Sequence, residues 1–103
     1  SLNEIIEADK VTLPSEIHLI KRIIYQGTEK KALIKKISLI MKIILRKKGI
    51  ICRNYTETFQ KFSSEFKIKN YDISNELYEG PLNKQLLEYA QNIIDCLVNG
   101  YVL

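Results

Sequence analysis

The chain has few of the residues that build metal sites or catalytic centres. Its 103 residues include a single histidine, His18, two cysteines, Cys52 and Cys96, and no tryptophan. One histidine and two distant cysteines exclude the usual zinc-ligand spacings and a disulfide framework. We therefore expect no metal and no cofactor, and both thiols should stay reduced in or near the core.

Glycine, proline and long apolar runs are also scarce. The chain has two prolines and four glycines, and each glycine follows a predicted helix, which excludes a glycine-rich phosphate-binding loop. The most apolar stretch, residues 37–45, is interrupted by Lys42 and is far shorter than the roughly 20 residues of a membrane span. The first residues lack the pattern of a secretory signal. With reduced cysteines, these absences predict a cytoplasmic protein.

The positive charge is concentrated in the middle of the chain. Residues 17–53 contain eleven lysines or arginines and one acid, Glu29, for a net charge of +10. The flanking segments 1–16 and 54–103 each carry −3, which leaves +4 for the whole chain. A positive middle between acidic ends predicts either an internal electrostatic match or a cationic surface for an acidic partner.

Apolar residues recur every three or four positions along most of the chain, which predicts an all-α protein. Helix-start patterns and helix-ending glycines divide it into segments. The start patterns include a capping box with Asn54 as cap and Glu57 three residues on, and Pro81 at the first position of the last helix. The predicted helices and their caps cover residues 12–26, 28–48, 54–66, 72–79 and 81–98. Residues 1–11 add a short helix or an arm. We expect one domain, residues 1–103, folded as a compact, roughly antiparallel bundle of four to five helices.

The helix predicted at residues 29–48 is the longest and the most basic. Its broad apolar face contains Leu33, Ile34, Ile37, Ile40, Met41, Ile44 and Leu45. A second apolar row, formed by Ala32, Leu39 and Ile43, lies between two groups of cations. A helix that is apolar nearly all round is usually central, so burial of both rows is the favoured interpretation. The alternatives are an exposed docking strip bordered by lysines, or a helix lying on anionic lipid.

The candidate partner-binding residues all lie on this helix: Lys31, Lys35, Leu39, Lys42, Ile43, Arg46 and Lys47. We expect a non-enzymatic protein–protein interaction module, such as a small intracellular inhibitor, an immunity-type protein or an adaptor domain, by analogy with other small helical bundles. The acidic ends, with Glu76, Glu79 and Glu88, offer a second surface for a basic partner. An exposed second row would also suit a homodimer.

The alternative function is nucleic-acid binding through the basic helix 29–48, since each phosphate contact requires a cation. No zinc finger, RNA-recognition motif or base-reading helix accompanies these lysines, and lysine outnumbers the better base reader, arginine. An enzyme is not expected, because no nucleophile or acid stands at a suggestive spacing from His18.

Overall fold

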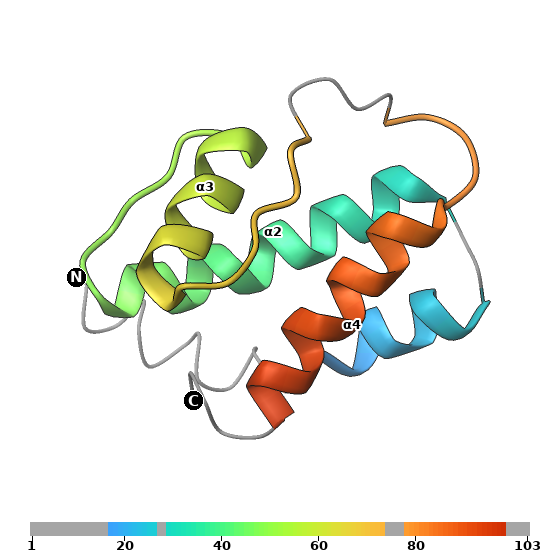
Figure 1. Ribbon diagram of the computed structural model, residues 1–103, viewed down its shortest axis with the longest axis horizontal. Helices are drawn as coiled ribbons and strands as arrows, with labels where there is room; N and C mark the ends of the chain where they lie inside the picture. Colours follow the sequence, from blue (N-terminus) through green and yellow to red (C-terminus); the bar gives the residue numbers. More distant parts are fainter. Residues whose placement is uncertain (1–16, 27–28, 74–77, 99–103) are drawn as a thin grey trace.

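The computed structural model of the chain describes residues 17–26, 29–73 and 78–98, and every regular element in these ranges is a helix (Figure 1). Residues 17–26 are helical. They are followed by α2 (Lys30–Lys47), α3 (Tyr55–Phe66) and α4 (Lys84–Val98). The predicted all-α class and compact shape are confirmed. None of these helices is long and apolar enough to cross a membrane.

The central helix, α2, is buried over most of its circumference. Nine of its 18 residues are buried, including the whole broad apolar face. From the second row, Ile43 is only 1% exposed, and Leu39 is half-buried against the core. Ala32 is also half-buried. The alternative prediction of an exposed apolar docking strip on this helix is therefore wrong, because neighbouring elements cover α2 on more than one side.

The other helices complete a single hydrophobic core around α2. The residues that they and the connecting segment bury are Ile20, Phe59, Phe62, Ile73, Leu86, Ala90, Ile93, Ile94 and Leu97. Burying one large aliphatic or aromatic side chain of this kind stabilises the fold by about 1.5–3 kcal/mol. Since the described residues share one core cluster, they behave as one packing unit.

The helices α2 and α4 begin at the same end of the molecule. The backbone N–H of Lys30 donates to the carbonyl oxygen of Gly80 at 3.3 Å, and Glu29 forms an isolated antiparallel bridge with Pro81. From this shared point the two helices diverge in the same general direction, and α3 crosses the C-terminal half of α2 (Figure 1). The antiparallel part of the predicted arrangement is not confirmed, because this backbone contact brings the two helix starts together.

The start of α3 follows the predicted capping pattern. Asn54 has extended backbone angles, and its side-chain oxygen accepts the backbone N–H of Glu57 at 2.8 Å. The hydroxyl of Thr58 donates to the carbonyl oxygen of Asn54 at 2.7 Å. These bonds satisfy groups that the first turn of a helix leaves without partners.

The start of α4 differs from the prediction, which placed Pro81 in its first turn. The helix begins at Lys84, because the side chain of Asn83 accepts the backbone N–H of Leu86 at 2.7 Å and acts as the cap. Pro81 is instead held in the bridge with Glu29.

Some predicted features lie outside the described residues. These are residues 1–16 with the arm and first helix start, the stop at Gly27, the cap at Thr28, the middle of the helix predicted at 72–79, and the stop at Gly100. Residues 72–73 and 78–79, at the ends of that predicted helix, are not helical. The residue before α2 is Glu29, which makes no side-chain capping bond.

Replacing the α3 cap should lower stability by a measurable amount. We expect Asn54→Ala to reduce the free energy of unfolding by about 1 kcal/mol, because the N–H of Glu57 loses its acceptor. Urea unfolding followed by circular dichroism measures this change. The matched variant Asn54→Asp keeps an acceptor and should unfold near the original midpoint. An equal loss in both variants would show that the cap does not stabilise α3.

Candidate functional site

The structure does not bring the seven predicted partner-binding residues into one site. Lys31 and Lys35 are exposed near the start of α2, whereas Lys42, Arg46 and Lys47 are half-buried near its end. At 1.5 Å per residue, Lys31 and Arg46 lie about 22 Å apart along the helix. The two apolar members, Leu39 and Ile43, belong to the core or its edge.

A smaller part of the predicted set lies beside the connector that follows α2. Lys42 and Arg46 line a shallow depression of about 60 Å³ together with Ile50, Ile51 and Cys52. The side chain of Ile51 is 63% exposed, which is unusual for a large aliphatic residue in this structure. We call this region the Ile51 surface and define it by Lys42, Arg46, Ile51, Arg53 and Lys61.

Local backbone geometry places Ile51 on the outside. Gly49 adopts a positive φ of 80°, a left-handed conformation that favours glycine and ends α2. The backbone N–H of Ile50 then donates to the carbonyl oxygen of Leu45 at 3.0 Å, which folds the chain back over the last turn. Ile50 packs against the core, and the following Ile51 projects into solvent.

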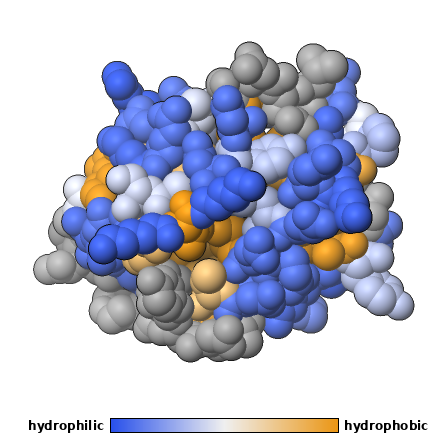
Figure 2. Space-filling view, in the orientation of Figure 1, coloured by the Kyte–Doolittle hydropathy of each residue, from blue (hydrophilic) through white to orange (hydrophobic). Residues whose placement is uncertain are grey.

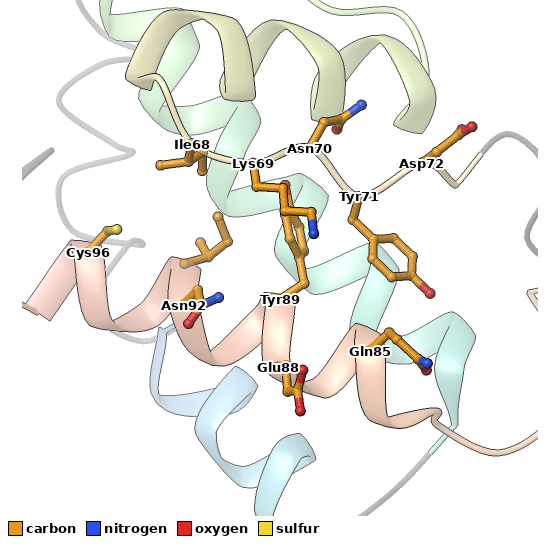
Figure 3. Close-up of a pocket in the computed structure, with 11 residues that line it drawn as sticks. Ile68, Lys69, Asn70, Tyr71, Asp72, Gln85, Glu88, Tyr89, Asn92 and Cys96 are labelled. Carbon is orange, nitrogen blue, oxygen red and sulfur yellow. The ribbon is translucent and has the colours of Figure 1, made fainter.

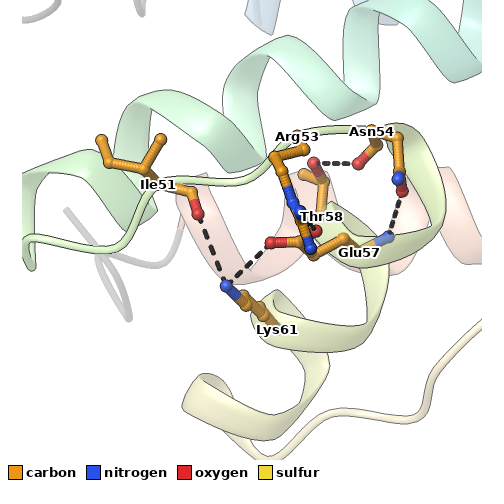
Figure 4. A network of polar contacts seen from close by, with 6 residues as sticks. All are labelled: Ile51, Arg53, Asn54, Glu57, Thr58 and Lys61. Atoms are coloured by element: carbon orange, nitrogen blue, oxygen red, sulfur yellow. Dashed lines mark hydrogen bonds and ion pairs between the residues drawn. The ribbon is translucent and has the colours of Figure 1, made fainter.

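A network of polar contacts fixes this connector to α3 (Figure 4). The Lys61 ammonium lies 2.9 Å from a carboxylate oxygen of Glu57 and donates to the carbonyl oxygen of Ile51 at 3.4 Å. Nε of Arg53 donates to the other Glu57 oxygen at 3.3 Å. The hydrogen bond from Lys61 is the largest cause that lowers the pKa of Glu57 below its usual value, and the bond from Arg53 is a smaller one. The carboxylate therefore stays ionised, and these contacts are lost only in acid.

The end of α2 and the start of α3 carry an excess of positive charge. The local cations are Lys42, Arg46, Lys47, Lys48, Arg53 and Lys61. The carboxylates of Glu57 and Glu65 are already paired, the latter with Lys48 at 3.7 Å. The ammonium of Lys42 lies 5.7 Å from the centre of the Tyr55 ring, and Lys48 makes a similar contact with Phe66 at 5.1 Å. Among the described residues, these six cations and two carboxylates give the region around Ile51 a net positive charge, although Arg46, Lys48, Arg53 and Lys61 each have a partner of their own.

A second candidate site is a cleft of about 510 Å³ between α4 and the segment that follows α3 (Figure 3). Its walls include Ile68, Lys69, Tyr71, Glu88, Asn92 and Ile93. On the face seen in Figure 2, an apolar patch near the centre is bordered by hydrophilic residues. By its own lining residues, the cleft combines apolar walls with a few charged and amide groups, as small-molecule sites do.

Tyr89 joins the two walls of this cleft. Its ring stacks on Phe59 with the centroids 5.5 Å apart, and it lies at the same distance from the ring of Tyr71. The residue is 8% exposed, and its hydroxyl has no hydrogen-bond partner among the described residues. Burial raises the pKa of Tyr89 to about 12, and the neighbouring Ser63 hydroxyl opposes this rise by a smaller amount without reaching hydrogen-bond geometry.

The sequence pattern does not predict this cleft, because residues 67–70 form only a polar break between predicted helices and tyrosines at helical spacing favour the core or its rim. The available indication was the order of Gln85, Glu88 and Asn92, which forms a polar row along α4 beside its apolar face. Of the acidic residues considered for a basic partner, Glu79 and Glu88 are exposed, and Glu76 lies outside the described residues.

Within the described ranges, no group of three or more histidine, cysteine, aspartate or glutamate residues is arranged to hold a metal ion. Cys52 and Cys96 are both free and half-buried. No protein-family model, curated protein or solved structure matches this chain. The functional argument therefore depends on the surfaces of the molecule itself.

Removing the unpaired hydroxyl should reveal the cost of its burial. The unfolded chain releases the Tyr89 proton near pH 10, whereas the folded protein keeps it until about pH 12. Between these pH values only the unfolded chain loses this proton, so the free energy of unfolding falls by about 2–3 kcal/mol as the pH rises from about 10 to about 12. Tyr89→Phe should lack this component, and near pH 7 it should be equally stable or about 1 kcal/mol more stable.

Urea unfolding at pH 7 and at alkaline pH measures this difference. The control Tyr25→Phe changes a side chain that is 93% exposed and should follow the alkaline loss of the original protein. A marked loss of stability in Tyr89→Phe at pH 7 would contradict the prediction, since it would mean that the hydroxyl is satisfied.

Proposed function

We propose that this protein is a non-enzymatic protein-binding module that binds an acidic partner through the Ile51 surface. The observation that carries the proposal is an isoleucine side chain, 63% exposed, set among cations whose nearby carboxylates are already paired. Small inhibitors, immunity-type proteins and adaptor domains are members of this functional class.

The composition of this surface suits a protein interface. Interfaces combine an apolar centre, which is fully desolvated in the complex, with a polar and charged rim. Ile51 supplies the apolar centre, and Lys42, Arg46 and Arg53 supply positive charge to the rim. The positive potential would attract an acidic partner and speed its association, while burial of Ile51 would slow dissociation.

The geometry supports a preorganised surface. The connector that carries Ile51 is tied to α3 through Lys61, so its backbone does not have to be ordered when the partner binds. Preorganisation lowers the entropic cost of association. The partner that fits is an acidic protein segment with an apolar side chain that covers Ile51.

Nucleic-acid binding is the competing function, and it would depend on different residues of the same region. A phosphate backbone would use the cations along α2, including the exposed Lys31 and Lys35, and would gain little from Ile51. Its affinity would fall steeply with salt, whereas an interface with an apolar centre keeps much of its affinity.

The test is affinity capture from nuclease-treated lysate of the organism of origin at moderate salt, with quantification of the captured proteins. We expect an acidic protein to be retained, and Ile51→Ser and Arg53→Glu should each reduce its recovery by about tenfold or more, as loss of an interface anchor does. The matched control, Lys84→Glu, alters an exposed cation on α4 and should leave recovery unchanged.

Thermal unfolding of each variant shows whether the fold is retained. Recovery of nucleic acid alone without nuclease, lost on digestion or at high salt, would overturn the proposal in favour of phosphate binding. A concentration-dependent homodimer that Ile51→Ser dissociates would show instead that the surface binds a second copy of the chain.

A further inference from the structure

The cleft between α4 and residues 68–72 places opposite charges on its two walls. Lys69 belongs to the segment after α3, and Figure 3 shows its side chain extended toward α4. Glu88 belongs to the α4 wall. Both side chains are exposed, and within the described residues neither forms an ion pair with the other or with a third group.

Apart from Asp72, the remaining lining is apolar or neutral. Ile68 contributes aliphatic surface from one wall, Ile93 lies almost fully buried (1% exposed) in the other, and Asn92 contributes an amide that can donate and accept hydrogen bonds. Asp72 also borders the cleft, but its carboxylate is directed away from it (Figure 3), and it takes part in another contact. The cleft thus offers one cation and one anion without a partner among the described residues, together with some apolar surface.

We infer that this cleft binds a small zwitterion with an apolar side chain, namely a free aliphatic α-amino acid. The ligand carboxylate would pair with Lys69, its ammonium with Glu88, and its side chain would pack against Ile68 and Ile93. A simple carboxylic acid would leave Glu88 unmatched, and a simple amine would leave Lys69 unmatched. The volume of about 510 Å³ falls in the range of small-molecule sites.

This site is separate from the proposed protein-binding surface. The Ile51 surface is formed by α2, the connector after it and α3, whereas the cleft is formed by α4 and residues 68–72. Ile51→Ser should therefore leave amino-acid binding unchanged, and failure of one proposal does not decide the other.

The experiment is an NMR titration of the ¹⁵N-labelled protein with L-leucine. We expect saturable shifts of the backbone amides of residues 68–72 and 85–93. Three matched ligands each lack one recognised group: 4-methylpentanoate lacks the ammonium, 3-methylbutylamine lacks the carboxylate, and glycine lacks the apolar side chain. Each should bind about tenfold more weakly or worse, because each leaves a charge or an apolar wall unmatched.

Variants of the protein test the same pairing from the other side. Lys69→Met and Glu88→Gln should each weaken leucine binding by about tenfold or more. The matched controls, Lys84→Met and Glu79→Gln, alter exposed charges that do not line the cleft and should bind as the original does. Absence of saturation with leucine, equal binding of 4-methylpentanoate, or insensitivity to both cleft variants would overturn the inference.

Discussion

The structure depends on the burial of α2. Half of its residues leave water, and they come from both apolar rows, so the other described elements must cover it from more than one side. Because of that burial, the lysines and arginines of α2 lie on the part of its surface that is not covered. Where this part meets α3, Lys42 lies against the ring of Tyr55, while Lys48, just after the helix, lies against Phe66. Their long apolar stems cover the edge of the core while their charges stay near solvent.

A second constraint is the backbone contact between Lys30 and Gly80, which joins the starts of α2 and α4. Because these helices diverge from one point, the chain after α3 must return along the molecule before α4 can begin (Figure 1). This return places residues 68–72 beside the polar row of α4 and creates the cleft. Tyr89 fills the junction between Phe59 and Tyr71, and its unpaired hydroxyl is a cost of that aromatic packing.

The two candidate sites differ in what holds them in place. The Ile51 surface is fixed by polar contacts: Lys61 joins Glu57 to the carbonyl oxygen of Ile51, and Arg53 completes the network. The cleft is fixed by packing, since aromatic contacts connect its walls while Lys69 and Glu88 remain unpaired within the described residues. A surface fixed by its own salt bridges is suited to a large partner that covers it. Unpaired opposite charges across a cleft are suited to a small ligand that connects them.

The sequence by itself determined the helical class, the position of α2, its broad buried face and the Asn54 cap, because helical spacing and capping are local properties of neighbouring residues. The sequence favoured burial of the second apolar row but left its exposure open, and only the tertiary structure decided that Ile43 is buried, that Ile51 is exposed and that α4 begins at Lys84. Burial of a residue on a second apolar row depends on which element covers it, and the period of the sequence does not identify that element. The cleft is the extreme case, since Lys69 and Glu88 come to line the same cleft only through the path of the chain between α3 and α4.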